Sequence, residues 1–280
     1  MMNIKLNNGV EMPSVGIGTF MLEPNDAYNS VKEALKIGYK LIDTANAYVN
    51  ERAVGRAIKD SSVNREDIFI SSKLWPSEYE NDNAVDETLE RLGVEYIDLL
   101  FLHQPAGNWI EGYKKLEKAY RDGKVRSIGI SNFEGEYIEE LLSICEVVPQ
   151  VIQVECHPYY PQDELRKIIE SRDIKIMSWY PLGHGDTKLL KEDIFSKLGD
   201  KYNKSPAQII LKWHIQMGFI VIPGSKNAEH IKDNFDILDF ELTEDEMNEI
   251  SKLNNGSRYY HRTDSQLEQF ANWQPEYEKE

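Results

Sequence analysis

The chain has 280 residues, of which 41% are hydrophobic, and its formal net charge is -16. This length allows one large α/β domain or two small ones. The negative charge disfavours nucleic acids and anionic membranes as partners, because both need a basic surface, although a local cluster can still bind an anionic small molecule. No apolar run approaches the roughly 20 residues of a membrane span, and the N-terminus shows no secretion signal.

The two cysteines, Cys145 and Cys156, show neither a CxxC pattern nor zinc spacing. Reduced thiols are typical of cytosolic proteins, so we expect a cytoplasmic protein without membrane or nucleic-acid partners.

Short apolar segments alternate with helical patterns along most of the chain. The segments are apolar throughout rather than alternately polar, which favours strands that are buried on both faces, as in a parallel sheet. Eight strands are predicted, at residues 14–20, 39–43, 68–73, 97–103, 125–131, 151–155, 174–180 and 219–223.

Helices are predicted between these strands, and each shows apolar residues at helical spacing. They cover residues 26–37, 50–60, 81–92, 109–122, 135–143, 163–171, 192–217 and 228–235. Thr243 and Glu246 form a capping-box pattern that predicts a further helix after the last strand. Asn8 and Gly9 predict the turn of an N-terminal β-hairpin that closes the bottom of the barrel. The tail, residues 254–280, is aromatic and polar and shows no period.

Eight β/α repeats within about 240 residues predict a TIM (β/α)8 barrel rather than a doubly wound sheet. A doubly wound sheet typically has five or six strands and a glycine-rich first loop, and the first loop here (GIGTF) lacks GxGxxG. No linker or low-complexity segment divides the chain. We therefore expect one α/β barrel domain over residues 1–280, with an N-terminal hairpin, an extra C-terminal helix and a tail.

Ionisable residues stand where three neighbouring strands end. Asp43 ends the second strand and Tyr48 lies in the following loop, while Lys73 and His103 end the third and fourth strands. Taken one at a time, Asp43 is more typical of a turn and Tyr48 of packing. Lys73 alone is more typical of a solvated charge, and His103 of a structural histidine. Because active sites of barrels lie at the carboxyl ends of the strands, all four together indicate a reaction centre.

These residue types suit the protonation of an oxygen. A phenol with a pKa of about 10 is protonated at neutral pH, and a lysine ammonium about 4 Å away would lower that pKa through an interaction of about 4 kcal/mol. Asp43 can keep Lys73 charged, and His103 can orient a carbonyl oxygen toward Tyr48. The set lacks a nucleophile–base pair for acyl transfer and the HxH or HExxH spacing of a metal site, so we expect no metal. Protonation of an oxyanion fits hydride delivery to a carbonyl group by a cofactor.

The sequence resembles the aldo-keto reductase family over residues 4–253, most closely its bacterial carbonyl reductases of the 2,5-diketo-D-gluconate reductase type. The shared motifs occur in the family's order: GYKLIDTANAYVNERAVG (38–55), ISSKLW (70–75), IDLLFLHQP (97–105), IGISNF (128–133), QVECHPYYPQ (153–162), SWYPLG (178–183) and VIPGSKNAEHIKDNFDILDFELT (221–243). The resemblance implies that Tyr48 is the proton donor, Lys73 and Asp43 its partners, and His103 the residue that orients the substrate.

The resemblance also implies a nicotinamide cofactor held without a Rossmann loop. Ser131, Asn132 and Gln153 would hold the carboxamide, and Tyr180 would stack on the nicotinamide ring. The other implied cofactor contacts are Thr19, Phe20, Pro181, Leu182, Gly183, Pro223, Gly224, Ser225, Lys226, His230, Asp233 and Asn234. Phe20, Trp75, His103 and Trp109 would wall the substrate pocket.

Three positions depart from the family pattern. Gly224 stands where lysine is usual and His230 where arginine is usual, and both changes remove charge from the site that distinguishes NADPH from NADH. Lys226 can substitute, because an ammonium binds phosphate as a point charge. NADPH is the expected cofactor, with NADH as the alternative. Gln104 replaces a tryptophan that often follows the histidine, which would reshape the pocket wall.

We expect an NAD(P)H-dependent reductase of small aldehydes and ketones, of the alcohol dehydrogenase type and monomeric like many family members. Two alternatives remain open. One is a binding or sensing module on the same barrel with little turnover. The other is a phosphosugar isomerase or an aldolase that uses Lys73 as a Schiff base. The tail, with Arg258, Tyr259, Tyr260, Phe270 and Trp273, either folds over the pocket or packs against the barrel wall.

Overall fold

Eight parallel strands form a barrel in the computed structural model, which describes residues 2–278. Each strand pairs with the next along the chain, and a parallel bridge between Val15 and Val221 joins the first strand to the last. The strands are β3 (Gly16–Gly18), β4 (Leu41–Asp43), β5 (Phe69–Leu74), β6 (Leu99–Leu102), β7 (Ile128–Ser131), β8 (Val151–Glu155), β9 (Lys175–Trp179) and β10 (Ile220–Val221). The predicted (β/α)8 barrel is confirmed, although most strands are shorter than predicted.

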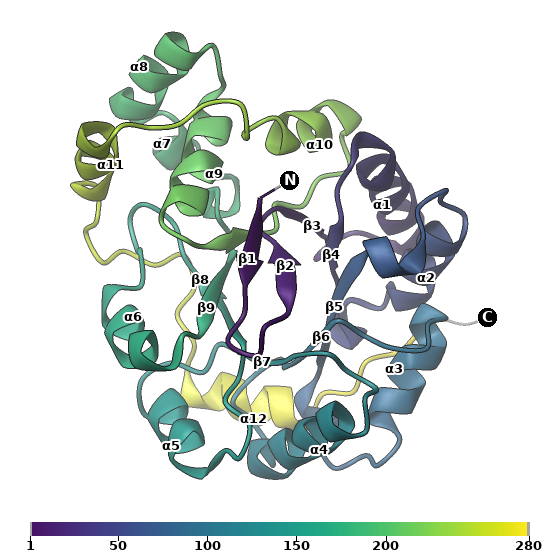
Figure 1. The fold of residues 1–280 in the computed structure, drawn as a ribbon. Helices are drawn as coiled ribbons and strands as arrows, with labels where there is room; N and C mark the ends of the chain where they lie inside the picture. The colour runs from purple at the N-terminus through teal and green to yellow at the C-terminus, as the bar shows by residue number, and fades with distance from the viewer. Residues whose placement is uncertain (1, 279–280) are drawn as a thin grey trace.

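Helices surround the barrel as an outer layer (Figure 1). Those that follow the strands are α1 (Pro24–Ile37), α2 (Glu51–Lys59), α3 (Ala84–Leu92), α4 (Trp109–Arg121), α5 (Glu136–Ile144), α6 (Asp163–Ile169), α7 (Thr187–Leu190), α8 (Asp193–Tyr202), α9 (Pro206–Gln216) and α10 (Ala228–Phe235). The prediction of one helix over 192–217 was wrong. Asn203 takes a left-handed conformation that ends α8, and Ser205 caps α9 with Pro206 in its first turn.

The barrel interior and its outer wall are both apolar, which explains the unbroken hydrophobic strands. Leu99 and Phe101 of β6 point into the barrel, whereas Leu100 and Leu102 pack against the helices. Gly129 of the neighbouring β7 leaves room for the Phe101 ring, because a Cβ at position 129 would lie 2.5 Å from it. The core therefore fixes the strand ends on which the polar residues stand.

The N-terminal hairpin covers one end of the barrel. β1 (Asn3–Lys5) pairs antiparallel with β2 (Glu11–Pro13), and Gly9 takes a φ of 88° in the turn between them. Leu6 and Met12 join the apolar cluster inside the barrel, and the Asn8 side chain donates to the backbone oxygen of Arg126. Figure 1 views the molecule from this side, with the hairpin across the ring of strands.

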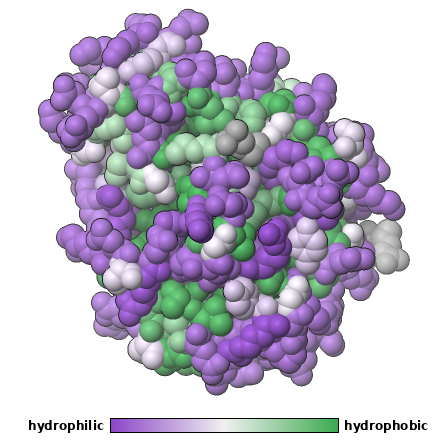
Figure 2. Space-filling model, in the orientation of Figure 1, coloured by the Kyte–Doolittle hydropathy of each residue, from purple (hydrophilic) through white to green (hydrophobic). Residues whose placement is uncertain are grey.

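The chain after the barrel contains two helices. α11 (Glu244–Ser251) begins with the predicted capping box of Thr243 and Glu246. The tail also forms α12 (Asp264–Asn272), which the sequence analysis missed because only a second capping box, at Thr263 and Gln266, marks it. None of the helices within residues 2–278 is long and apolar enough to cross a membrane. Hydrophilic residues dominate the face shown in Figure 2, with hydrophobic ones in patches between them.

Candidate active site

Asp43 and Lys73 form a fully buried ion pair at the ends of β4 and β5. The Lys73 Nζ donates to Asp43 Oδ2 at 2.7 Å and to the backbone oxygen of Thr44 at 2.7 Å. Asp43 Oδ1 also accepts hydrogen bonds from Ser71 Oγ at 2.8 Å and Gln153 Nε2 at 3.1 Å. Burial lowers the pKa of Lys73, and the charge of Asp43 opposes that shift.

The loop that carries Tyr48 is tied down by a buried asparagine. Asn50 precedes α2, and its Oδ1 accepts hydrogen bonds from the hydroxyls of Thr44 at 2.8 Å and Thr19 at 3.3 Å. Its Nδ2 donates to the backbone oxygens of Thr19 and Leu22. Tyr48 ends a 3-10 turn (Asn46–Tyr48), and Val49 then takes a left-handed conformation. The hydrogen bonds of Asn50 thus hold the loop that positions the Tyr48 side chain.

Tyr48 faces both Lys73 and His103. The Lys73 Nζ lies 4.8 Å from the centre of the Tyr48 ring, and the ring of His103 lies 5.6 Å from it. His103 in turn packs edge-on against Trp75 at 5.0 Å between ring centres. The structure therefore brings together all four residues that the sequence placed at the strand ends (Asp43, Tyr48, Lys73 and His103), called the polar cluster below.

Burial sets the protonation states of the polar cluster. It raises the pKa of Tyr48 well above its usual range, and the charge of Asp43 adds to that shift. The prediction of a lowered pKa for Tyr48 was therefore wrong, because burial outweighs any opposing effect of the Lys73 ammonium, which donates to Asp43 and Thr44. Burial and the charge of Lys73 lower the pKa of His103 well below its usual range. At neutral pH the site therefore holds a protonated phenol and a neutral imidazole.

A cavity of 1210 Å³ opens at the polar cluster. Asp43, Tyr48 and His103 line it at one end, as do Phe20 and Trp75. The residues expected to contact a cofactor that also line the cavity are Ser131, Asn132, Gln153, Tyr180, Pro181, Leu182, Pro223, Gly224, Ser225, His230, Asp233 and Asn234. The cavity exceeds the roughly 300–1,000 Å³ of typical small-molecule pockets, so it has room for a ligand as large as a dinucleotide.

Other predicted residues lie outside this lining. Trp109 packs edge-on against Phe133 in the core, at 5.4 Å between ring centres, so its assignment to the pocket wall was wrong. Lys226 is not among the described residues that line the cavity, and its Nζ lies 3.5 Å from Asp26 Oδ2. Thr19 is buried behind the wall and donates to the backbone oxygen of Asp43. The Tyr259 hydroxyl packs against Gly183, because a Cβ at position 183 would lie 2.8 Å from the hydroxyl oxygen.

Lys73 is 0% exposed and does not appear among the described residues that line the cavity. A Schiff-base lysine must present an unprotonated Nζ to a carbonyl carbon. Lys73 Nζ instead donates to two oxygen acceptors within the wall. This arrangement argues against the aldolase alternative.

The side chains expected at the carboxamide are already oriented by the protein. Asn132 takes a φ of 65°, donates to the backbone oxygen of His103 at 3.1 Å and accepts from Trp179 Nε1 at 3.0 Å. Tyr180 takes a φ of 53° at the end of β9, and its ring stacks on His184 at 4.2 Å. His184 also lines the cavity, and the sequence analysis did not single it out.

Tail residues complete the cavity. Tyr260, Gln269, Phe270 and Trp273 line it, so the tail folds over the pocket. Trp75 Nε1 donates to the backbone oxygen of Phe270 at 2.9 Å, and the ring of Trp75 also packs edge-on against Trp273. Of the two alternatives that the sequence left open for the tail, the structure shows the one in which it folds over the pocket.

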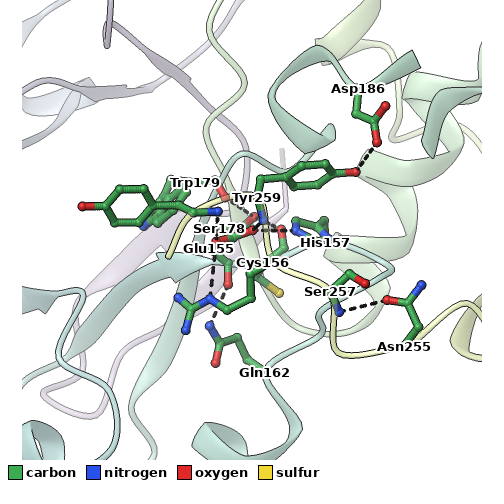
Figure 3. A network of polar contacts seen from close by, with 12 residues as sticks. Glu155, Cys156, His157, Gln162, Ser178, Trp179, Asp186, Asn255, Ser257 and Tyr259 are labelled. Carbon is green, nitrogen blue, oxygen red and sulfur yellow. Dashed lines mark hydrogen bonds and ion pairs between the residues drawn. The ribbon is translucent and has the colours of Figure 1, made fainter. Parts of the chain in front are cut away.

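A buried carboxylate anchors this tail (Figure 3). Glu155 ends β8, and its carboxylate accepts hydrogen bonds from the backbone N–H groups of Tyr259 at 2.6 Å and Tyr260 at 3.3 Å. His157 Nε2 lies 2.9 Å from the same carboxylate. The Tyr259 hydroxyl then donates to Asp186 Oδ2 at 2.7 Å, which ties the tail to the loop after β9. Glu155 stands two residues after Gln153, and no motif on the sequence alone signals its role.

Among residues 2–278, no cluster of three or more histidine, cysteine, aspartate or glutamate side chains could hold a metal ion.

Comparisons with known proteins agree on one family. The model of the family described as "Aldo/keto reductase family" matches residues 14–255. The chain is 45% identical to a glyoxal reductase of Bacillus subtilis (strain 168) over 91% of this chain and 94% of the relative. It is 38% identical to the methylglyoxal reductase DkgA of Escherichia coli (strain K12), again over 91% and 94%. The crystal structure of MGS-M4, an aldo-keto reductase from a Medee basin deep-sea metagenome library, superposes with a TM-score of 0.90 at 40% identity, covering 93% of this chain and 98% of that one.

Proposed function

Since the protein belongs to the aldo/keto reductase family, we propose that it reduces small aldehydes and ketones to alcohols with a nicotinamide cofactor, as an oxidoreductase of the alcohol dehydrogenase type. The observation that carries this proposal is the polar cluster at one end of a 1210 Å³ cavity. Relatives named for the reduction of glyoxal and methylglyoxal support small carbonyl substrates. Neither these relatives nor the site favours a sensing module.

Each member of the polar cluster has a role in this reaction. The neutral His103 donates a hydrogen bond to the carbonyl oxygen and holds it near the Tyr48 hydroxyl. When bound, the cofactor supplies the hydride that reduces the carbonyl carbon. Tyr48 gives its proton to the oxygen of the developing alkoxide, which is a stronger base than a phenolate. The ammonium of Lys73, 4.8 Å from the ring centre and held by Asp43, stabilises the resulting phenolate.

The volume and lining of the cavity support a nicotinamide dinucleotide that would extend away from the polar cluster. Ser131, Asn132 and Gln153 would hold the carboxamide, and Tyr180 would stack on the ring. Pro181, Leu182 and Gly183 would cover the pyrophosphate, and Ser225, Asp233 and Asn234 would contact the adenosine end. The loop that holds Gly183 is tied to the tail through Asp186 and Tyr259, which supports a firmly held cofactor.

NADPH is the proposed cofactor, although Gly224 and His230 lack the charges usual in the family. Lys226 is 73% exposed at its side chain, and its pair with Asp26 is a surface contact that is worth little. The ammonium can therefore turn toward a 2′-phosphate near Ser225. A titration that follows the quenching of tryptophan fluorescence should give a lower Kd for NADPH than for NADH. Lys226→Ala should weaken NADPH binding and leave NADH binding unchanged, and equal effects on both would contradict this role.

Substitution of Tyr48 by phenylalanine tests the mechanism. Tyr48→Phe should still bind the cofactor but lose nearly all reduction of a reactive aldehyde, about 10²–10⁴-fold, because the proton donor is gone. Tyr202→Phe is the matched control, because its hydroxyl bonds Glu246 away from the cavity. Reduction by Tyr48→Phe at the rate of the unmodified enzyme would overturn the mechanism.

We further propose that the whole chain acts as one domain, monomeric and cytoplasmic. Two free thiols, Cys145 and Cys156, support a reducing compartment. Of the large hydrophobic side chains that are exposed among the described residues, Phe20, Met21 and Trp273 line the cavity, which leaves little apolar surface for a second subunit. Light scattering during size-exclusion chromatography tests the oligomeric state.

A further inference from the structure

The C-terminal end of the described chain packs behind the polar cluster, outside the cavity. After α12 the chain runs on to Tyr277 and Glu278, which lie against α3 and α2 (Figure 1). Neither of them is among the described residues that line the cavity. Any effect of this segment on the reaction must therefore pass through the residues that it contacts.

One contact reaches the turn of Tyr48 through a buried asparagine. Asn46 is 0% exposed and begins the 3-10 turn that Tyr48 ends. Its Oδ1 accepts from the backbone N–H of Trp75 at 3.0 Å, so the other end of the amide is the NH₂ group. That group donates to the Tyr277 hydroxyl at 3.3 Å, and the hydroxyl donates to Glu78 Oε1 at 3.1 Å. The Tyr277 hydroxyl is thus a partner of a buried amide on the turn of the proton donor.

A second contact covers the ion pair behind Lys73. The guanidinium of Arg91 lies 4.1 Å from the centre of the Tyr277 ring. Arg91 Nε donates to Glu51 Oε2 at 2.6 Å, and Ser72 donates to the other oxygen of that carboxylate. Burial lowers the pKa of Lys73, and the charge of Glu51 is among those that oppose this shift. The Tyr277 ring therefore packs on an ion pair whose carboxylate helps to keep Lys73 charged.

A third contact caps the helix that follows Tyr48. α2 begins at Glu51, and Glu278 Oε2 accepts from the backbone N–H of Ala53 at 3.0 Å. Glu278 Oε1 also pairs with Arg56 at 2.5 Å. A carboxylate is favoured at this end of a helix, because the helix dipole is positive there. The residue after Tyr277 is thereby fastened as well, which holds the tyrosine in its place.

We propose that Tyr277 is a positioning residue for the proton donor and that it acts on Tyr48 through Asn46. Its hydroxyl holds one end of a three-residue turn whose other end is Tyr48, so loss of the hydroxyl lets the phenol shift. Proton transfer needs the donor and the acceptor within about 2.6–3.2 Å, so a small shift is enough to slow it. This inference rests on the carbonyl reductase function proposed above. It is carried by the three contacts with which the last two described residues converge on one loop.

Single-turnover kinetics of Tyr277→Phe test the inference. The substitution removes the hydroxyl and keeps the ring over Arg91. Enzyme saturated with NADPH is mixed with aldehyde, and the loss of NADPH absorbance is followed through one turnover, so that product release does not contribute. The limiting rate constant should fall about 2–10-fold, the contribution of one neutral hydrogen bond. The Kd for NADPH and the aldehyde concentration at half the limiting rate should stay unchanged, because Tyr277 does not line the cavity.

A pair of aldehydes separates a displaced proton donor from a general loss of structure. 4-Nitrobenzaldehyde gives a less basic alkoxide than 4-methoxybenzaldehyde does, so its reduction depends less on the proton of Tyr48. Tyr277→Phe should therefore slow the methoxy compound more than the nitro compound and raise the ratio of their limiting rate constants. This ratio is measured on one preparation and is independent of the fraction that folds. A purely structural role of Tyr277 would leave it unchanged.

A double variant tests the route through Asn46. Asn46→Ala already lacks the amide, so adding Tyr277→Phe to it should not slow the reaction further. The limiting rate constant of one turnover does not depend on how much of the variant folds, so the comparison holds for a less stable protein. If the two substitutions slow the reaction by independent factors, Tyr277 does not act through Asn46 and the proposal is overturned.

Tyr202→Phe is the matched control, because the Tyr202 hydroxyl also donates to a glutamate, Glu246, but far from the cavity. It should keep both the limiting rate constants and their ratio. If Tyr277→Phe behaves like this control, or slows both aldehydes equally, the role of Tyr277 is overturned while carbonyl reduction stands. If the unmodified enzyme reduces neither these two aldehydes nor methylglyoxal, the proposed function fails as well.

Discussion

The ion pair between Lys73 and Asp43 should be a source of stability that a double-mutant cycle can measure. Lys73→Met removes the ammonium from a site that is 0% exposed and leaves the Asp43 carboxylate with hydrogen bonds from Ser71 and Gln153 alone. Breaking a buried pair in this way costs about 3–5 kcal/mol, mostly because a buried charge loses its partner. The double variant Lys73→Met, Asp43→Asn removes both charges and should be destabilised by less than the sum of the two single changes.

Urea unfolding, followed by tryptophan fluorescence and circular dichroism, gives the four free energies of unfolding. We expect a coupling of about 2–3 kcal/mol between the two sites. Lys212→Met is the matched control, because Lys212 is also buried but lies over the ring of Phe240, and Glu241 and Asp239 act on its charge without a salt bridge among the described residues. That change should cost far less. Additive effects of Lys73→Met and Asp43→Asn would refute the argument that each charge is tolerated only because of the other.

Two further predictions concern the cofactor loop and the response to acid. Tyr259→Phe removes the hydrogen bond to Asp186 and should raise the Kd for NADPH by about 2–10-fold in a fluorescence titration. The control Tyr202→Phe should leave this Kd unchanged. An unchanged Kd in Tyr259→Phe would show that the tail does not hold the loop. Burial lowers the pKa of His214 from 6.5 to about 4. Between pH 6.5 and pH 4 the unfolded chain therefore binds a proton at His214 that the folded protein does not bind. The contribution of His214 should lower the free energy of unfolding by about 3 kcal/mol as the pH drops from 6.5 to 4. His214→Gln should make this fall shallower by that amount, and an identical pH dependence in both proteins would contradict the assignment.

The barrel could be predicted because strand and helix patterns alternate regularly along the sequence. Each strand is buried on both faces, so segments such as IDLLFLH (97–103) are apolar without interruption, and each is followed by a helical pattern. The polar cluster followed from the barrel, because Asp43, Lys73 and His103 stand at strand ends that must meet at one edge. Local sequence alone was sufficient for these features.

Features that depend on contacts between distant segments could not be predicted. Trp109 and Trp75 are both tryptophans that follow a strand, yet one packs in the core on Phe133 and the other faces the cavity. The helix at 264–272 is recognisable only by its capping box, and its place over the pocket depends on Glu155, more than a hundred residues earlier. Such placements are decided by tertiary packing, which a pattern along one segment does not contain.

The protonation state of Tyr48 shows why residue types alone were insufficient for the electrostatics. The prediction of a lowered pKa used a charge about 4 Å away and ignored what else that charge contacts. In the structure, burial raises the pKa of Tyr48 and the charge of Asp43 adds to that shift, while the Lys73 ammonium donates to Asp43 and Thr44. The phenol therefore keeps its proton at neutral pH. The proposed reaction needs that proton at this position, and the developing alkoxide oxygen would be basic enough to take it without a lowered pKa of Tyr48.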